Sequence, residues 1–413
     1  MYLVVLAKIQ GVTLSPVWET EKRAPVLGII GGGQLAQMLF QSAISIGVEV
    51  HILRSEGDQS LNSYAKELTV ASSFDATTLY HFARRCDIVT FDHELIPAQI
   101  VSELSSRNCT MLPNATTLAL AADKARQRRT LAEAGIPTPR FAVVESAAEV
   151  EAISAAFKFP LILKAARGGY DGRGVVEISS MDDVISIFGT SKMPVPYVVE
   201  ERLDLDAELS VLVVRSSNRK EVSVYQPIRT RQHEGICVEA SWPSHLPRSI
   251  DARAVEIALS IAELVDSVGV LAVEFFVVGG EVLVNELAPR VHNSGHLTIE
   301  AAKTSQFENH IRAVLGFALG STDFISPASM VNLIAGPDAK EHRPLQLAAA
   351  LSVAGASLHD YHKSPKPKRK VGHVTVLADS TTSASADAWE SARRAMMAPL
   401  LGDPMAALGT HQN

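Results

Sequence analysis

Short apolar runs alternate with longer amphipathic segments between Val26 and Pro113, and this alternation constrains the fold more than any other feature. The run VLGII is followed by the helix-compatible QLAQMLFQSAISIG, and VEVHIL, ELTVAS and DIVTF continue the series. Such alternation is typical of parallel strands joined by crossover helices. We therefore predict a doubly wound parallel α/β domain over residues 25–121.

The first strand-to-helix turn is rich in glycine and reads LGIIGGGQLAQM. Gly31, Gly33 and Ala36 fit the G-x-G-x-x-[GA] pattern of dinucleotide-binding folds. The second strand ends in Arg54 rather than the usual ribose-binding acid, although an NADP site can use an arginine there. A glycine turn before a helix N-terminus also suits other phosphates. The turn alone therefore leaves a nicotinamide site and a phosphate cradle open.

The remaining chain divides into further units. Helical periodicity from Asn114 ends near Gly135, where prolines follow. We interpret ASMVNLIA, LQLAAALSV and HVTVLA as a β-rich C-terminal unit that contains the basic connector HKSPKPKRK. The predicted division is an extension over 1–24, the α/β domain over 25–121, a domain over 122–320 with its lid at about 140–200, the β-rich unit over 321–400 and a tail over 401–413.

Two acidic residues flank a strong hairpin signal, VEFFVVGGEVLVNE. A two-residue turn at Gly279-Gly280 would send Glu274 and Glu286 to opposite faces. A three-residue loop would oppose them directly, which is destabilising unless a cation lies between them. Because magnesium prefers carboxylates and substrate phosphates, we predict the odd-length loop and a shared face. The alternative is two unrelated acids.

A lysine closes the strand-like PLILK and precedes the loop GGYDGRG. Lys164 and the backbone N–H groups of such a loop suit nucleotide phosphates, and its glycines permit closure as a lid. The loop is not a Walker A motif. The run VVEERLDLDAELSV resembles an edge that binds adenine through backbone groups and ribose through Glu208. The alternative for GGYDGRG is an ordinary flexible surface loop, and the alternative for the acids of VVEERLDLDAELSV is that they are solvated.

Composition excludes other classes of function. The 413 residues carry a net charge of -7, which argues against a general nucleic-acid binder. No apolar run reaches the length of a membrane span, so we expect no membrane partner. Cys86, Cys109 and Cys237 lack metal-ligand spacing, and we expect reduced thiols in a cytoplasmic protein.

In order, a basic residue, a strand lysine, a glycine loop, an acidic strand end and two metal carboxylates resemble an ATP-grasp enzyme. The spelling is similar to the 5-(carboxyamino)imidazole ribonucleotide synthase family, the ATP-dependent carboxylase of purine biosynthesis, over about residues 26–377. The motifs that carry this resemblance are GGGQL at 31–35, GGYDGRG at 168–174, NELAPRVHNSGH at 285–296, TSQFENH at 304–310 and KRKVGHVT at 368–375. It implies an α/β ATP-grasp architecture with an N-terminal pre-ATP-grasp domain, a small α+β lid and a β-rich C-terminal unit.

The resemblance also implies roles for individual residues. Those expected to bind ATP are Lys124, Lys164, Gly172, Gly174, Glu200, Glu201, Arg202, Leu203, Glu208, Gln232 and Asn285. Magnesium, with manganese as an alternative, would be held by Glu274 and Glu286. The catalytic residues would be Asp171, Arg173 and Arg290. Those expected at the aminoimidazole ribonucleotide are Gln34, Leu35, Glu94, Tyr170, His292, Asn293, Lys363 and Arg369. The glycine turn would then be a phosphate cradle for this ribonucleotide.

The sequence departs from the family pattern in places. Lys124 stands where arginine is usual, and Gln232, beside His233, stands where many members have histidine. The common acidic stretch E-F-E-N reads Asp92–Leu95, in which we retain Glu94, and Val291 replaces a frequent proline. The remaining histidines that we expect to be structural or superficial are His51, His81, His310, His342 and His359, with His373 left open.

Several alternatives stay open at this point. The chain could be another ATP-grasp ligase, such as the formate-dependent glycinamide ribonucleotide transformylase, or a catalytically inactive nucleotide-binding regulator. The third alternative is a nicotinamide-dependent oxidoreductase that uses the glycine turn. The family implies bicarbonate, ATP and the ribonucleotide as small-molecule substrates, and a homodimer. The acceptor of the substrate amine's proton is either Asp171 or released phosphate.

Overall fold

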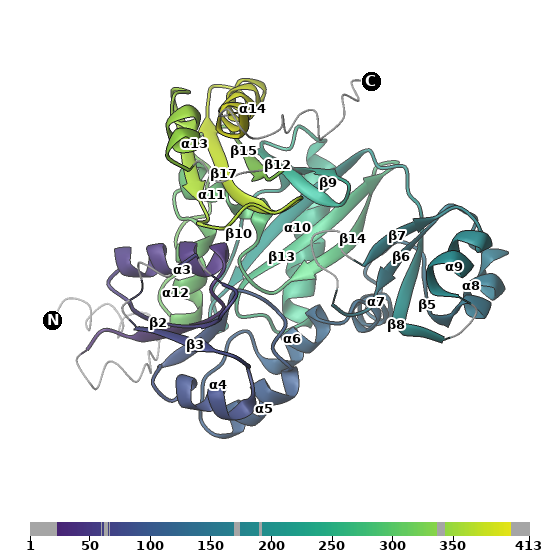
Figure 1. Cartoon of the computed structure of the whole chain (residues 1–413), viewed down its shortest axis with the longest axis horizontal. Helices are drawn as coiled ribbons and strands as arrows, with labels where there is room; N and C mark the ends of the chain where they lie inside the picture. Colours follow the sequence, from purple (N-terminus) through teal and green to yellow (C-terminus); the bar gives the residue numbers. More distant parts are fainter. Residues whose placement is uncertain are drawn as a thin grey trace.

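The structure, a computed structural model, describes residues 23–397 except 59, 62–64, 66, 169–173, 190–191 and 337–342. Most of the predicted N-terminal extension and all of the predicted tail lie outside the described residues, as does His342. Within them, three sheets are arranged from left to right in Figure 1.

The first sheet is parallel, with strand order β3-β2-β1-β4, and confirms the doubly wound α/β prediction. Its strands are β1 (Val26–Ile30), β2 (Glu49–Ser55), β3 (Glu67–Ala71) and β4 (Ile88–Phe91). Its helices are α3 (Gln34–Ser45), α4 (Ala76–Ala83) and α5 (Ala98–Ser106). Ile29 packs with α3 and Ile30 with α4 and α5, because successive strand residues point to opposite faces.

Two helices follow where the sequence suggests one helical passage. These are α6 (Ala115–Ala121) and α7 (Lys124–Glu133). The break falls at Asp123, whose side chain accepts a hydrogen bond from the Arg126 N–H and caps α7. Gly135, at φ +69, follows the end of α7 as predicted.

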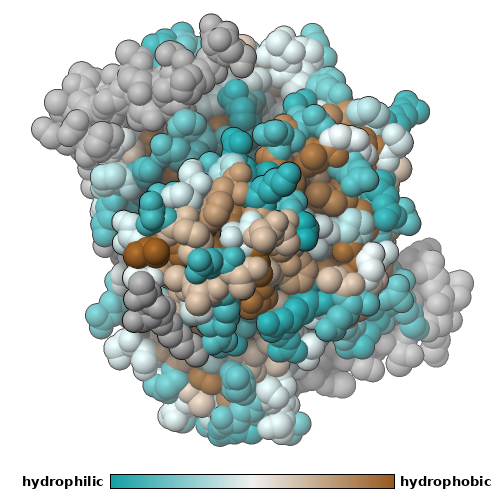
Figure 2. Space-filling view, turned by 90° about the vertical axis from the view of Figure 1, so that its right-hand side faces the viewer, coloured by the Kyte–Doolittle hydropathy of each residue, from teal (hydrophilic) through white to brown (hydrophobic). Residues whose placement is uncertain are grey.

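The second sheet is antiparallel, with order β5-β8-β6-β7, and lies at the right of Figure 1. Its strands are β5 (Phe141–Ser146), β6 (Leu161–Ala165), β7 (Val175–Ile178) and β8 (Lys192–Glu201). Its helices are α8 (Ala147–Ser154) and α9 (Met181–Phe188). We call this unit the lid. Figure 2 shows the molecule from the lid's side, where apolar and polar side chains mix.

The third and largest sheet has the order β14-β13-β9-β11-β12-β15-β17-β16, with β10 paired to β9. Its strands are β9 (Ala207–Arg215), β10 (Val222–Val224), β11 (Ile228–His233), β12 (Ile236–Trp242), β13 (Gly269–Val278), β14 (Glu281–Ala288), β15 (Ala328–Ile334), β16 (Ala356–Asp360) and β17 (Lys370–Leu377). Helix α10 (Arg248–Leu264) packs on one face, and α12 (Gln306–Leu315) packs on the other and against α3. Two short helices, η1 (Asn293–Gly295) and α11 (Thr298–Ala301), follow β14.

The C-terminal strands extend this central sheet rather than form a sheet of their own. The β-rich interpretation of LQLAAALSV is wrong, since α13 (Arg343–Ala350) covers most of it. A further helix, α14 (Thr381–Met397), packs on β15 and β17. No helix among the described residues is both long enough and apolar enough to span a membrane.

One buried histidine joins the first sheet to the central one. His310 accepts a hydrogen bond from the Val270 N–H at Nδ1 (3.1 Å), which leaves Nε2 to donate to Thr90 Oγ1 (2.8 Å). The predicted structural role of His310 is confirmed. Burial lowers its pKa to about 4.

Candidate active site

The hairpin of β13 and β14 brings the two predicted carboxylates together by an unexpected route. Val278 pairs with Glu281, so the turn at Gly279-Gly280 has two residues and the predicted odd-length loop is wrong. A β-bulge shifts the register between Phe275 and Glu274, and Glu274 pairs with Glu286. The predicted shared face is therefore confirmed, because the bulge supplies the one-residue shift that a three-residue loop would give.

The opposed carboxylates are electrostatically strained. Burial, followed by the charge of Glu286, raises the pKa of Glu274 to about 7. Glu286 forms an ion pair with Lys124, and His292 Nδ1 lies 3.8 Å from Glu274 Oε1. Among the described residues no three His, Cys, Asp or Glu side chains form a metal-binding group. Two opposed carboxylates nevertheless fit magnesium, which completes its shell with substrate phosphates and water.

A closed ring of contacts lies beside these carboxylates. Lys164 Nζ lies 2.7 Å from Glu200 Oε2 and donates to Asn285 Oδ1 (2.9 Å). Arg128 completes the ring through Glu200 Oε1 (2.6 Å) and the Asn285 carbonyl oxygen (2.7 Å). The ring joins α7, the lid strands β6 and β8, and β14, which carries Glu286. It places a lysine, the predicted phosphate ligand, next to the carboxylate pair.

Part of the predicted ATP site lies where β8 leaves the lid. Glu201 pairs with Arg140 (3.1 Å), and Arg202 lies 3.5 Å from Glu177 in β7. Leu203 follows on the same stretch. Glu208 stands opposite Phe276 in the register of β9 and β13, and burial raises its pKa to about 7.

Gln232 lies near a bulge in β11 and pairs with Cys237 in β12. Gly174 is at φ +78, and its carbonyl oxygen accepts from the Ala165 N–H (2.8 Å). The predicted residues that lie outside the described residues are Tyr170, Asp171, Gly172 and Arg173.

The glycine turn lies against a buried carboxylate that sequence reasoning did not select. Asp92 Oδ2 accepts a hydrogen bond from the Gly33 N–H (3.0 Å), immediately before Gln34 and Leu35 begin α3. Gly31 has φ +122, and a Cβ there would lie 1.6 Å from Asp92 Oδ1. Glycine is therefore required for both backbone and space.

The basic connector reaches this turn from the other end of the chain. Lys363 Nζ donates to Gln34 Oε1, and Gln37 Nε2 donates to the Asp360 carbonyl oxygen (3.1 Å). Arg369 donates to the Ser364 carbonyl oxygen within the connector (3.1 Å). The start of α3 and the connector are therefore in direct contact.

Between the turn and the carboxylates lies a guanidinium–carboxylate pair. Arg290 Nε and Nη2 donate to the two oxygens of Glu94 at 2.6 and 3.2 Å. Burial alone would raise the pKa of Glu94, but the Arg290 guanidinium lowers it to about 2. His292 lies near Glu274, and Asn293 exchanges hydrogen bonds with Asn332 at 3.0 and 2.7 Å. The structure thus brings the residues predicted to bind the nucleotide close to those predicted to bind the ribonucleotide.

His296, His359 and His373 form a cluster of packed imidazole rings. His373 stacks on His359 at a ring distance of 4.4 Å, and its Nδ1 lies 2.8 Å from the Tyr361 hydroxyl. His359 is bonded to Glu300 (2.6 Å), and His373 is fully buried. Burial lowers the pKa of His373 well below its usual range. His359 and His373 are therefore packing residues here.

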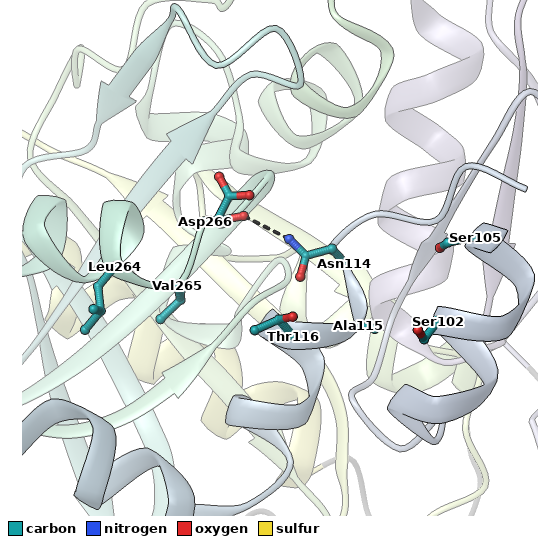
Figure 3. A pocket seen from close by; sticks show the side chains of 8 residues that line it. All are labelled: Ser102, Ser105, Asn114, Ala115, Thr116, Leu264, Val265 and Asp266. Carbon is teal, nitrogen blue, oxygen red and sulfur yellow. Dashed lines mark hydrogen bonds between the residues drawn. The ribbon is translucent and has the colours of Figure 1, made fainter. Parts of the chain in front are cut away.

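A separate cavity of about 320 Å³ lies between α5, α6 and the end of α10. Figure 3 shows Asn114, which donates to the Asp266 carbonyl oxygen (3.2 Å) across it. None of the predicted site residues lines this cavity. The candidate active site is therefore defined by the side-chain contacts described above.

The lid, the central sheet and the carboxylate hairpin define an ATP-grasp enzyme. Three family models match the chain in order: the ribonucleotide synthetase preATP-grasp domain over 25–122, the ATP-grasp domain over 129–307, and the phosphoribosylaminoimidazole carboxylase C-terminal domain over 328–387. The N5-carboxyaminoimidazole ribonucleotide synthase of Mycobacterium tuberculosis strain H37Rv is 38% identical over 362 residues, or 86% of this chain and 84% of that protein. The chain belongs to the N5-carboxyaminoimidazole ribonucleotide synthase family.

Solved structures agree with this assignment. The Aspergillus clavatus carboxyaminoimidazole ribonucleotide synthase, complexed with ATP, is 28% identical with a TM-score of 0.82, covering 90% of this chain and 99% of that one. The A. clavatus enzyme in complex with ADP and 5-aminoimidazole ribonucleotide is 28% identical with a TM-score of 0.81, at the same coverage. The architecture predicted from the resemblance is confirmed.

Proposed function

We propose that this protein uses ATP and bicarbonate to carboxylate the 5-amino group of 5-aminoimidazole ribonucleotide, releasing ADP and phosphate, in de novo purine biosynthesis. The observation that carries the proposal is the pairing of Glu274 with Glu286 beside Lys164 on an ATP-grasp framework. The names of the family's members and their complexes with ATP and with ADP and the ribonucleotide support it.

ATP binds between the lid and the central sheet. Lys164 and Lys124 meet its phosphates, the backbone from Glu201 to Leu203 borders the adenine, and Glu208 accepts from the ribose. The other residues that we assign to this site are Gly172, Gly174, Glu200, Arg202, Gln232 and Asn285. Glu274 and Glu286 would hold magnesium or manganese, which would neutralise phosphate charge. With Glu286 engaged by the metal, Lys124, its ion-pair partner, would be available to the nucleotide phosphates.

Bicarbonate is a poor electrophile, and the γ-phosphoryl group converts it to carboxyphosphate. The phosphoryl transfer needs positioning and positive charge more than a covalent nucleophile. Lys164 and Arg290 provide that charge. Carboxyphosphate then delivers carbon dioxide to the amine of the ribonucleotide. The amine's proton passes to Asp171 or to the released phosphate.

The ribonucleotide lies between the glycine turn and the connector. Gln34, Leu35, Lys363 and Arg369 bind its phosphate at the start of α3, where backbone N–H groups favour anions. The groups that we assign to its imidazole and to the reacting centre are Glu94, Tyr170, Arg173, His292 and Asn293. Closure of the lid keeps water from carboxyphosphate.

The test is ADP release by the full-length protein with magnesium and each substrate omitted in turn. We expect release to require both bicarbonate and 5-aminoimidazole ribonucleotide. Release that instead requires glycinamide ribonucleotide and formate would identify the other ligase, and an absence of ATP turnover would identify an inactive regulator. We also propose a homodimer, which light scattering measures, and a cytoplasmic location.

A further inference from the structure

We propose that Arg128 is a positioning residue that sets the location of Lys164, and thereby the affinity for ATP, through Glu200. It rests on the proposed function only in taking ATP as the ligand. Arg128 lies one turn after Lys124 on α7, so both residues share a helix face. Arg128 is not among the residues predicted to bind a substrate.

Arg128 joins the lid to the body of the enzyme. Its Nε donates to Glu200 on lid strand β8, and its Nη2 donates to the Asn285 carbonyl oxygen on β14. The side chains of Arg128 and Glu200 are each only 3% exposed, so water screens their attraction little. A guanidinium suits this place because its rigid fork reaches two acceptors at once.

The same carboxylate holds the lysine. Glu200 gives Oε1 to Arg128 and Oε2 to Lys164, so each cation occupies one oxygen. Lys164 uses a second N–H on Asn285 Oδ1, which leaves its third N–H for a nucleotide phosphate. Without Arg128, both oxygens of Glu200 become available to Lys164, and the β14 carbonyl loses its donor. The ammonium is then drawn toward β8 and away from the phosphate.

Stability alone does not explain an arginine here. Nη1 of Arg128 is buried and has no partner among the described residues. A buried unpaired donor costs free energy, and buried ion pairs are often replaced by apolar side chains without loss of stability. What the arginine adds is the positioning of Glu200 and Lys164.

The experiment compares Arg128→Met, Arg128→Lys and the control Arg129→Met in the full chain. Arg129 is the neighbouring arginine on α7, and it is exposed. The dissociation constant of a non-hydrolysable ATP analogue is measured with magnesium, together with kcat, both KM values and the melting temperature. Binding of the analogue does not require carboxylation, so this result stands apart from a failure of the proposed reaction.

We expect Arg128→Met to weaken analogue binding about 10-fold or more, the effect of losing one charge-assisted hydrogen bond. Arg128→Lys should recover part of this loss, and Arg129→Met should bind normally. The KM for the ribonucleotide should not change. Unchanged analogue affinity in folded Arg128→Met would overturn the proposal, whatever happens to the melting temperature. If that variant does not fold, Arg128→Lys decides: wild-type affinity contradicts the role.

Discussion

Replacing Gly31 by alanine tests how the glycine turn is built. The residue has φ +122, and its new Cβ would lie 1.6 Å from Asp92 Oδ1. Asp92 must therefore move, which breaks its 3.0 Å hydrogen bond from the Gly33 N–H. Gly47→Ala is the matched control, because Gly47 has φ +76 with nothing within 4 Å of a Cβ.

The structure sets the size of both effects. A non-glycine residue in a sparsely populated region costs about 1–3 kcal/mol. Losing a hydrogen bond to a charged group adds about 1.5–3 kcal/mol at Gly31 alone. We therefore expect Gly31→Ala to lower the free energy of unfolding by about 2.5–6 kcal/mol. Gly47→Ala should lower it by about 1–2 kcal/mol.

Urea unfolding of the two variants and the wild type measures the difference. The KM for 5-aminoimidazole ribonucleotide should also rise in Gly31→Ala, because the turn before α3 binds its phosphate in the proposed function. It should not change in Gly47→Ala, at the far end of the helix. Equal destabilisation by the two substitutions would refute the reasoning, since it would show that Asp92 does not restrict Gly31.

Four other outcomes are expected. Glu286→Gln should abolish ribonucleotide-dependent ATP hydrolysis while circular dichroism stays native; retained turnover would contradict its metal role. Arg290→Ala should impair carboxylation, and unchanged steady-state kinetics would remove it from the site. Because burial lowers the pKa of His310 from its ordinary value of 6.5 to about 4, stability should fall by about 3 kcal/mol as pH drops through that window, and His310→Gln should flatten the profile in urea unfolding. The pKa of Glu94 is lowered to about 2 by Arg290, so its stabilisation is present above pH 4.5 and lost as pH falls toward 2; Glu94→Gln should remove this dependence, and an unaltered acid limb would argue against the pair.

Local patterns predicted the elements better than their connections. The alternation after Val26 predicted the parallel sheet, because apolar strands and crossover helices have different periods. LQLAAALSV does not reveal its helix, since a short apolar run fits either period. The hairpin shows a subtler limit: a three-residue loop and a two-residue turn with one bulge give Glu274 the same partner. Sequence spacing cannot distinguish them.

Contacts between distant segments have no local signal. Lys363 and Gln34 are 329 positions apart, and only the family resemblance placed them in one site. Arg128 does have a local signal, because it follows Lys124 by one helical turn. In the sequence Asp92 is only a departure from the family pattern, and its hydrogen bond to the glycine turn is visible only in the three-dimensional structure.

The fate of the oxygen atoms of bicarbonate tests the central claim most directly. Bicarbonate labelled with oxygen-18 is supplied with ATP, magnesium and 5-aminoimidazole ribonucleotide, and released phosphate is analysed by mass spectrometry. Attack of a bicarbonate oxygen on the γ-phosphorus forms carboxyphosphate, and breakage of its carbon–oxygen bond leaves that oxygen on phosphate. We predict phosphate carrying a single labelled oxygen, in amounts equal to the ADP formed. Unlabelled phosphate released at the full rate would contradict activation of bicarbonate by this protein.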